Sequence, residues 1–516
     1  MVLIVCILFG TVILFGILAS RRKPDSREPP YVKPRIPFIG HAFGILRYGV
    51  PYYENLCTGP IFTLDLLVNR LYVITSAKLV SAVQKNHKII SFDPFMTAAA
   101  KRMAGMDGPG LHLIGDTRSG GGDLSNKVLQ AMIPSLLGDG LRDLNETMLQ
   151  HMLPLVEELL AISESTVDLH MWCRHIITTA STNAIWGSKN PFKSNKVVED
   201  FWYFESHLSI LLADLLPSLT ARKALRAREN VVQAMLDFSR ADGYAESDCS
   251  SLALARRETQ KAHGATDVNI ARLETAINIG ILSNTVPAAF WTIFEIYSRP
   301  ELLQAIRIEV EQNALLINPN TNVHSIDLGR IKSGCPLLVS TFQEMLRVHS
   351  NGAPTRMVYE DIMLNDTYLL KAGSIVQISG PAINNEVSSW GCQAKRFDPS
   401  RFLNAEHRTN TRNVPNAKPR VNSFMSFGTS PNLCPGRHFA SAEVLSLVAM
   451  LVMRAEITPS EGRWWTPKLN AWAIAATVTP PKQAYPVKLY TRKEFKGLNW
   501  SFKMEGTKEK FDLVTG

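Results

Sequence analysis

The sequence lacks any pair of cysteines in a C-x-x-C arrangement, and its seven cysteines are scattered along 516 residues. Such an odd and dispersed set argues against a disulfide framework and against zinc knuckles. The three glycines at 120–122 have no Lys-Ser or Lys-Thr after them, which argues against a phosphate-binding loop. We interpret residues 107–123, which contain them, as a flexible loop. No internal repeat and no long basic block occurs, so the net charge of +9 favours a membrane surface or an acidic protein over nucleic acid.

The first twenty residues contain a long uncharged run, Val2 to Ala19, which is followed by Arg21, Arg22 and Lys23. Eighteen helical residues at about 1.5 Å each reach about 27 Å, enough to cross a thin bilayer. We therefore predict an N-terminal transmembrane helix, residues 1–20, as a single-pass anchor. The positive flank keeps the remaining chain in the cytosol. A cleaved signal peptide is the alternative, although no small-residue cleavage site follows a short apolar run.

The rest of the chain divides into a connector and one domain. Residues 21–40 are basic and rich in proline, which predicts a stiff, extended connector. Residues 41–516 read as a single domain that is mainly α with minor β. Two strands are expected within 59–77, helices dominate 124–308, and strands return over 353–383. Near the C-terminus, "NAWAIAATVTPP" (470–481) and "YPVKLYTR" (485–492) resemble the two strands of a hairpin.

One helical stretch, "TAINIGILSNTVPAAFWTIFEIYSRPE" (275–301), is apolar on nearly every side, which predicts burial. Pro287 lies in its interior and cannot donate a hydrogen bond to the carbonyl of residue 283. The helix should open locally, beside Gly280, Ser283, Asn284 and Thr285. This opening is either an ordinary kink in a core helix or a small polar groove that holds a diatomic ligand and a water molecule.

A charged pair lies in "STFQEMLRVHS" (340–350), where Glu344 and Arg347 are three residues apart and share a helix face. Arg401, in "AKRFDPSRFL" (394–403), is a possible third member of an ionic cluster. A solvated surface pair is the common alternative for such spacing. A buried cluster would need further hydrogen bonds to be tolerated.

The stretch "SFMSFGTSPNLCPGRHFA" (423–440) places Cys434 between an irregular loop and a helix that starts near Arg437. A thiol just before a helix meets unpaired N–H groups and the positive end of the dipole, which favour thiolate. The cysteine is either an inert buried residue, a nucleophile or a metal ligand. A nucleophile would need a histidine and an orienting acid, and His438 is too close in sequence for that role. A thiolate can also ligate haem iron.

Together and in this order, the long helix with its groove, E-x-x-R, F-D-P-x-R-F and F-G-x-x-x-x-x-C-P-G-R-x-F-A resemble cytochrome P450, the haem-thiolate monooxygenases. The resemblance covers essentially the whole chain. "NTVPAAFW" (284–291) resembles the branch of sterol 7-hydroxylases and prostacyclin synthase, and "CPGRHFA" (434–440) resembles fungal biosynthetic members. The resemblance implies the cytochrome P450 fold, a helical bundle around haem with small β-sheets.

The resemblance also implies roles for individual residues. It makes Cys434 the axial iron ligand of a haem b (iron protoporphyrin IX), with Phe427 shielding the thiolate and Gly436 letting the loop turn close to the cofactor. Arg356, in "APTRMV", corresponds to an arginine that reaches a haem propionate. The buried structural cluster would consist of Glu344, Arg347 and Arg401.

The sequence departs from the family pattern in three places. Ser430 and Asn432 replace the usual glycine and basic residue of the thiolate loop. The helix that normally carries W-x-x-x-R has no such pattern, and Lys127 is a poor substitute for its arginine. In the groove motif A-G-x-(acid)-Thr, Ser283 replaces the acid and Asn284 the threonine if Gly280 takes the first position.

A register shifted by one residue would instead put Asn284 at the acid and Thr285 at the threonine of the groove motif. We prefer the first register because it aligns the small residue. In either register the carboxylate is missing, so proton delivery is expected to run through Asn284, Thr285 and ordered water. Ser283, Asn284 and Thr285 are accordingly the predicted catalytic residues.

The expected function is that of a membrane-bound monooxygenase which oxygenates a lipophilic small molecule, such as a terpenoid, a steroid-like compound or another secondary metabolite. We expect a monomer in the endoplasmic reticulum membrane, with the catalytic domain facing the cytosol and no nucleic-acid partner. The substrate pocket is expected between residues 107–123, the groove helix, residues 353–356 and residues 471–475.

The chain leaves no room for a flavin domain, so electrons would come from a separate NADPH-cytochrome P450 reductase, with cytochrome b5 as a possible additional donor. Lys418, Arg420, Arg437 and His438 either form a basic docking face for that partner or are simply solvated.

Two alternatives to the monooxygenase remain. One is a haem-thiolate isomerase or dehydratase that acts on a peroxide or an oxygenated substrate without a reductase. The other is a non-catalytic, membrane-anchored haem-binding protein.

Overall fold

The computed structural model describes residues 25–34, 40–56, 58–66, 69–115, 118, 120–161, 165–214, 216–404, 422–505, 510–511 and 513. The predicted anchor, residues 1–20, lies outside the described residues, as do residues 21–24 and 35–39 of the connector. The described part of the connector is extended: Val32 N donates to Thr63 O at 3.0 Å, and Tyr31 forms an isolated bridge with Thr63.

The protein is mainly helical, as the sequence predicts. The α-helices are α2 (Gly40–Tyr48), α3 (Ala77–Lys85), α4 (Asp93–Ala99), α5 (Gly108–Ile114), α6 (Leu124–Met132), α7 (Gly138–Ala161), α8 (Leu169–Trp186), α9 (Asn195–Ser206), α10 (Leu208–Ala213), α11 (Pro217–Thr220), α12 (Arg222–Arg240), α13 (Ser251–Ala262), α14 (Asp267–Leu282), α15 (Thr285–Tyr297), α16 (Pro300–Asn313), α17 (Leu328–Gly334), α18 (Pro336–His349), α19 (Gly380–Asn384), α20 (Val387–Trp390) and α21 (Arg437–Arg454).

The strands are short and form several small sheets. They are β1 (Ile61–Leu66), β2 (Asn69–Ile74), β3 (Ile90–Ser91), β4 (Ser165–Asp168), β5 (Leu315–Ile317), β6 (His324–Asp327), β7 (Thr355–Val358), β8 (Ile362–Leu364), β9 (Tyr368–Leu370), β10 (Ile375–Ile378), β11 (Gly428–Thr429), β12 (Asn432–Leu433), β13 (Ala455–Pro459), β14 (Pro486–Thr491) and β15 (Trp500–Lys503).

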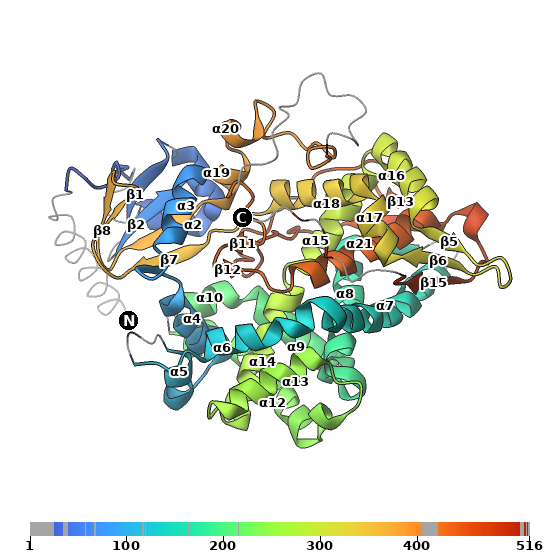
Figure 1. The fold of residues 1–516 in the computed structure, drawn as a ribbon, viewed down its shortest axis with the longest axis horizontal. Helices are drawn as coiled ribbons and strands as arrows, with labels where there is room; N and C mark the ends of the chain where they lie inside the picture. Colours follow the sequence, from blue (N-terminus) through green and yellow to red (C-terminus); the bar gives the residue numbers. More distant parts are fainter. Residues whose placement is uncertain are drawn as a thin grey trace.

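The largest sheet has the order β1-β2-β10-β7-β3 and lies at the left of Figure 1, with most of the helices to its right. The antiparallel β1–β2 pair confirms the two strands predicted within 59–77, with Ile61 opposite Ile74. β7 and β10 confirm the strands predicted within 353–383. The minor β component is therefore as expected from the alternating apolar residues.

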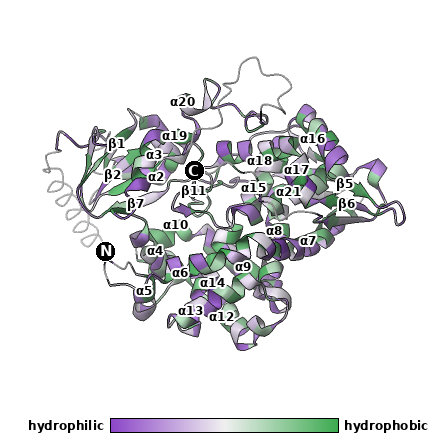
Figure 2. Cartoon of the chain, viewed as in Figure 1, coloured by the Kyte–Doolittle hydropathy of each residue, from purple (hydrophilic) through white to green (hydrophobic). Residues whose placement is uncertain are grey.

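The centre of the molecule is built around α15 and α21. Every residue of α15 is buried, and so is the part of α21 from Ser441 to Arg454. α15 packs against α8, α18 and α21. By contrast, the outer helices α12 and α13 carry both hydrophilic and hydrophobic residues along their ribbons (Figure 2). A helix that is apolar on all sides belongs in the core, and an amphipathic helix belongs at the surface.

The stretch Asp267–Tyr297, which joins α14 and α15, is the one helical segment among the described residues that is long and apolar enough to cross a membrane. It is 31 residues long, and 78% of its most apolar window is buried inside the protein. It is therefore a core helix, as its all-round apolar pattern predicts.

Two sequence expectations are wrong. Residues 108–114, within the predicted loop 107–123, form α5, because Asp107 caps that helix by accepting a hydrogen bond from Gly110 N at 2.8 Å. Residues 470–481 do not pair with 485–492 as a hairpin. Instead β14 lies between β13 and β4, and the 470–481 segment makes only isolated bridges, Ser350 with Val478 and Leu469 with Pro481. Long-range pairing has replaced the local pairing that the alternation favoured.

Candidate active site

The loop that carries Cys434 begins with a small antiparallel hairpin, β11–β12, and ends at the start of α21. Gly428 pairs with Leu433, and Cys434 N donates to Phe427 O at 2.9 Å. Gly428 has φ of +85°, a conformation that glycine adopts without strain. The hairpin lies near the middle of the view in Figure 1, between the large sheet and the helical body. The backbone therefore holds the cysteine in a defined turn.

One side of this turn is open. A side chain built at Gly436 would meet no other atom within 4 Å. Cys434 and Gly436 are half-buried, whereas most of α21 beyond them is fully buried. Phe427 is partly buried against the main core, with its ring 6.3 Å from that of Phe424. The turn thus combines a half-buried thiol with open space at Gly436 and a partly buried aromatic ring at Phe427.

Burial raises the pKa of the Cys434 thiol, and this outweighs the N–H groups of Gly436 and Arg437 and the charge of Arg437, which lower it. The helix start alone therefore does not produce a thiolate, contrary to the simplest expectation from sequence. A bound metal ion would supply the missing positive charge, because coordination deprotonates a thiol.

The other described cysteines offer no comparable donor. Cys173, Cys249 and Cys335 are buried, and burial raises the pKa of each thiol, that of Cys249 to about 11. Cys392 is exposed. Within the described ranges, no group of three or more His, Cys, Asp or Glu residues could hold a metal ion. A single thiol at an open turn suits a metal whose remaining ligands come from a macrocycle such as haem.

Arg356 on β7 is a buried cation beside the thiolate loop. The residue is 5% exposed, and burial lowers the pKa of its guanidinium to about 10, with the charge of Asp93 acting in the opposite direction. Its hydrogen bonds go to Thr355 O at 2.9 Å, Asn432 Oδ1 at 3.3 Å and Thr429 Oγ1 at 3.5 Å. Its guanidinium makes no ion pair with any carboxylate of the described chain. Such a buried cation fits an added carboxylate, such as a haem propionate.

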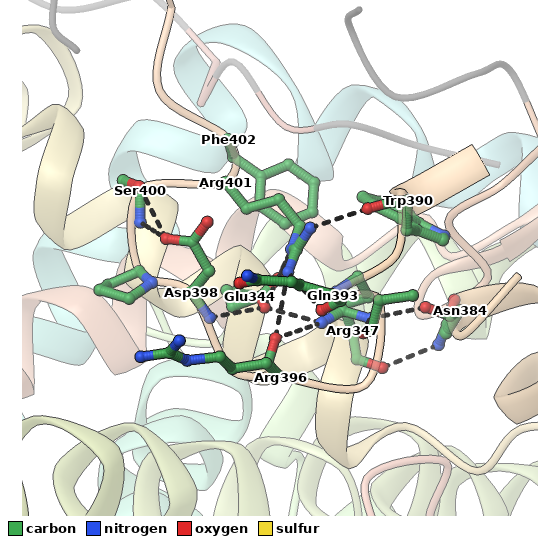
Figure 3. Close-up of polar contacts among 12 residues, drawn as sticks. Glu344, Arg347, Asn384, Trp390, Gln393, Arg396, Asp398, Ser400, Arg401 and Phe402 are labelled. Carbon is green, nitrogen blue, oxygen red and sulfur yellow. Dashed lines mark hydrogen bonds and ion pairs between the residues drawn. The ribbon is translucent and has the colours of Figure 1, made fainter. Parts of the chain in front are cut away.

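The structure brings Glu344, Arg347 and Arg401 together in a buried cluster (Figure 3). Arg347 Nε and Nη2 each donate to the Glu344 carboxylate at 2.7 Å, and Arg401 Nε lies 3.1 Å from both carboxylate oxygens. The Glu344 and Arg347 side chains are 0% exposed. Two arginines thus share one buried carboxylate.

The remaining donors of this cluster are bonded to the surrounding backbone. Arg347 Nη1 donates to Asn384 O and to Ala394 O, both at 2.6 Å. Arg401 Nη1 donates to Trp390 O at 3.2 Å, and Asp398 N donates to Glu344 at 2.9 Å. These bonds give the buried charges the full set of partners that such charges require.

The cluster is linked to the thiolate loop through Asn384. Its amide Nδ2 donates to Arg347 O at 3.0 Å, and its Oδ1 accepts from Met425 N at 3.3 Å. Ser426 Oγ also donates to Leu346 O at 3.0 Å. Met425 and Ser426 directly precede Phe427, so the cluster holds the base of the loop in position.

The groove lies where α14 ends and α15 begins. α14 ends at Leu282, α15 starts at Thr285, and Pro287 stands in the first turn of α15, where its missing N–H is tolerated. The predicted local opening is therefore present, and it lies at Ser283 and Asn284.

The three predicted groove residues have different surroundings. Asn284 Oδ1 accepts from Thr477 N at 2.6 Å and from Val478 N at 3.2 Å. Thr285 Oγ1 donates to Ile281 O at 2.8 Å. Ser283 is 2% exposed, and its Oγ makes no hydrogen bond to any described residue. Asn284 therefore holds the 477–478 backbone at the groove through two hydrogen bonds, whereas the Ser283 hydroxyl makes none to a described residue.

Other contacts join α14 and α15 to residues in or next to the segments that were expected to line the pocket. Asn269 Nδ2, near the start of α14, donates to Asp107 Oδ1 at 3.1 Å. Asn351 N donates to Thr477 O at 2.7 Å, which joins the 351–356 segment to the 471–478 segment. Trp291 Nε1 in α15 donates to Thr479 O at 2.9 Å.

Some acids near these elements escaped the sequence reasoning, and two of them have a raised pKa. Glu443 on α21 is 1% exposed, accepts from Ser181 Oγ at 2.8 and 2.9 Å, and has its pKa raised by burial to about 8. Glu205 on α9 is half-buried, and burial raises the pKa of its carboxyl. Neither residue belongs to a motif quoted above, and a single glutamate in a helix carries no signal of burial.

The proposed basic face is only partly described. Lys418 and Arg420 lie outside the described residues. His438 is 5% exposed, and burial lowers its pKa to about 4, so the expectation that it contributes positive charge to that face is wrong. Arg437 is half-buried, and its Nη1 donates to Cys434 O at 2.9 Å. Lys127, on α6, is half-buried.

Comparison with known proteins decides the family. The sequence model described as "Cytochrome P450" matches residues 29–486. This chain belongs to the cytochrome P450 family. Its members are haem-thiolate monooxygenases, so the cofactor of this enzyme is haem, bound through a cysteine thiolate.

Relatives of this cytochrome P450 come from fungi and mammals. Cytochrome P450 monooxygenase nodJ of Hypoxylon pulicicidum is 40% identical over 523 residues, which cover 100% of both chains. Cytochrome P450 7B1 of Mus musculus is 25% identical over 86% of this chain and 88% of its own. Cholesterol 7-alpha-monooxygenase of Cricetulus griseus is 22% identical over 90% of this chain and 94% of its own. The predicted resemblance to fungal and sterol-hydroxylating members is confirmed.

Proposed function

We propose that this cytochrome P450 is a membrane-bound monooxygenase in which Cys434 would hold the haem iron, and that it oxygenates a lipophilic secondary metabolite with a terpenoid or steroid-like skeleton. The half-buried thiol at the open turn before α21 is the observation that carries the proposal. Bound haem supplies the activation of molecular oxygen, so that one oxygen atom enters the substrate and the other becomes water.

The residues around the thiol have complementary tasks. Phe427 keeps water from the inner side of the sulfur, and the open Gly436 lets the cofactor approach the loop closely. Arg356 neutralises a propionate, because its buried guanidinium has spare donors and no anionic partner in the described chain. The cluster of Glu344, Arg347 and Arg401 acts at a distance by holding the loop in place.

The groove helix provides the distal wall of the site. Asn284 binds the backbone at 477–478 and so keeps the wall closed, while Thr285 and Ser283 present hydroxyl groups beside it. An apolar helix with a few polar side chains suits a substrate that is mostly hydrocarbon. The name of the 22% identical cholesterol 7-alpha-monooxygenase supports a steroid-like skeleton.

Two features support a membrane location: the apolar N-terminal residues and apolar side chains exposed on the described surface. Residues 1–20 would anchor the chain in the endoplasmic reticulum membrane with the catalytic domain in the cytosol, where an NADPH-cytochrome P450 reductase, with or without cytochrome b5, delivers electrons. Large apolar side chains exposed on the described surface suit such a membrane; they include Phe43, Leu216, Leu219, Trp472 and Ile474. We propose a monomer.

The decisive test is the absorption spectrum of the reduced, carbon monoxide-bound protein. The wild type should show the red-shifted Soret band of thiolate ligation, and Cys434→Ser should lose it. Cys392→Ser, at an exposed cysteine, is the matched control and should keep the band. A Cys434→Ser protein with an unchanged band would refute the assignment. Consumption of NADPH with added reductase, and analysis of products in a heterologous host, then test the reaction.

A second function is favoured by the missing acid in the groove. Ser283 and Asn284 stand where the family motif has an acid and a threonine, which suits an isomerase or dehydratase that rearranges a peroxide or an oxygenated substrate without a reductase. Turnover of a hydroperoxide with no reductase, together with no NADPH-dependent product, would decide for this function.

A further inference from the structure

Two side chains of the groove helix hold one short segment of distant backbone. Asn284, which directly precedes α15, accepts from Thr477 N at 2.6 Å and from Val478 N at 3.2 Å. Trp291, in the middle of α15, donates from Nε1 to Thr479 O at 2.9 Å. Asn284 and Trp291 are seven positions apart, which is about two helical turns, so they lie on the same side of the helix. One side of α15 therefore fixes three consecutive residues of this segment.

Trp291 is itself held in place by α18, the helix that packs beside α15 (Figure 1). The residue is 0% exposed, and its ring stacks on that of His349, with 3.9 Å between the ring centres and 15° between the planes. His349 ends α18, and its Nε2 lies 2.7 Å from Glu295 Oε1 on α15. His349 O also accepts from Thr479 N at 3.4 Å. The stack between two helices thus keeps the indole N–H directed at Thr479.

The carbonyl side of the same segment contacts the chain that leads to the thiolate loop. Asn351 N donates to Thr477 O at 2.7 Å. Five residues further along, Arg356 donates to Asn432 Oδ1 at 3.3 Å, and Asn432 is two residues before Cys434. Hydrogen bonds and a short stretch of chain therefore connect the groove helix with the loop that carries the thiol.

The residues next to this connection are small. Residues 352–354 are Gly, Ala and Pro, and three of residues 473–476 are Ala; apart from Ala476, all of them are at least partly exposed. A Cβ at Gly352 would come within 2.9 Å of the Thr477 side chain, so the two segments touch. Because small side chains fill little space, the room beside them depends on where the backbone lies.

We propose that Trp291 and Asn284 are positioning residues of the substrate pocket. They fix the side wall, which we define as residues 352–354 and 473–479, and the side wall limits the size and orientation of a molecule bound beside the haem. The proposal rests on the haem-thiolate function proposed above. Loss of either contact releases the side wall, so it changes the affinity for bulky ligands more than the affinity for small ones.

Binding of imidazoles of increasing bulk tests the proposal without turnover. Imidazole, 4-phenylimidazole and clotrimazole each shift the Soret band of a haem protein when they ligate the iron, so a titration gives each Kd. Trp291→Phe keeps an aromatic ring against His349 but has no N–H. Its Kd values for 4-phenylimidazole and clotrimazole, relative to imidazole, should change by about fivefold or more.

The Kd for imidazole should stay within about twofold of the wild type, because so small a ligand does not reach the side wall. A change of the same size for all three ligands would show a disturbed haem site rather than a displaced side wall. That result, or no change for any ligand, would overturn the proposal.

Asn284→Ala removes the other contact and should show the same dependence on ligand size. If both residues act through the side wall, the double variant should change the Kd ratio by less than the product of the two single changes. Trp202→Phe is the matched control, because Trp202 Nε1 also makes a buried hydrogen bond, to Thr178 Oγ1 at 3.2 Å, but joins α9 to α8. It should behave like the wild type, and the same size-dependent change in it would count against the assignment.

Failure of this proposal and failure of the proposed function give different results. A wild type that binds the imidazoles but consumes no NADPH with added reductase would count against the monooxygenase and leave the positioning residues supported by their Kd ratios. Normal NADPH consumption with equal Kd ratios in the wild type, Trp291→Phe and Asn284→Ala would refute the positioning role alone. A wild type whose Soret band does not respond to imidazole would refute both.

Discussion

Replacing Glu344 by glutamine would remove the negative charge that two buried arginines share. In the wild type this carboxylate accepts hydrogen bonds from Arg347 at 2.7 Å, from Arg401 at 3.1 Å and from Asp398 N at 2.9 Å. The glutamine amide would point two hydrogen atoms at guanidinium donors. It would thus leave two cations without a counter-charge in a region that water does not reach.

The expected cost follows from the burial of the group. Removing one partner of a buried ion pair destabilises a protein by about 3–5 kcal/mol, and a domain of ordinary stability has about 5–15 kcal/mol in total. With a urea m-value of about 3 kcal/mol/M, the midpoint of unfolding should fall by about 1–1.7 M. Arg401→Met should cost less, because the two bonds between Glu344 and Arg347 remain.

Urea unfolding followed by circular dichroism and by haem absorbance measures both variants. Glu311→Gln, at an exposed glutamate of α16, is the control and should change the free energy of unfolding by less than about 0.5 kcal/mol. If Glu344→Gln unfolds at the same urea concentration as Glu311→Gln, the cluster does not stabilise the protein and the reasoning fails.

Three further predictions concern the rest of the site. The folded protein holds the proton of Glu443 up to about pH 8, whereas the unfolded chain releases it near pH 4.5, so the free energy of unfolding should fall as the pH rises through that window, by up to about 5 kcal/mol. Glu443→Gln should flatten this slope in urea unfolding at several pH values, and an unchanged slope would refute the assignment. Asn284→Ala should leave Thr477 N and Val478 N without an acceptor and lower the free energy of unfolding by about 1–3 kcal/mol. Amide exchange at both positions should become faster. Unaltered exchange would show that the two hydrogen bonds to Asn284 do not hold this backbone in place. Arg356→Leu should lower the haem content of the purified protein, measured as absorbance per polypeptide, while Arg356→Lys should retain more haem. Full haem occupancy in both variants would contradict the proposal that the guanidinium binds a haem propionate.

Local patterns were sufficient for many elements. The alternation in residues 59–77 predicts β1 and β2, and Pro287 correctly marks the break between α14 and α15. The region 470–481 shows the limit of such patterns. Its apolar residues resemble a strand, but β14 pairs with β13 and β4, because a strand gains more from burial between two partners than from a nearby hairpin.

For the candidate site too, the sequence predicted some features and not others. Cys434 is predicted from its place between a loop and a helix, and the spacing of Glu344 and Arg347 predicts that they pair. The pKa of the thiol was not predictable, because burial by distant residues outweighs the helix start. The pairing of Glu443 with Ser181 was not predictable either, since the two residues are 262 positions apart along the chain.

The sequence by itself determined which residues could do chemistry and the order in which they occur: the thiol, the paired charges and the interrupted apolar helix. Spacing along one helix or one loop is a local property, so it can be read without the fold. Only the tertiary structure decided which of these groups are buried and which groups from distant parts of the chain they contact. Burial and long-range proximity arise when elements distant in sequence pack together, and no local pattern contains that information.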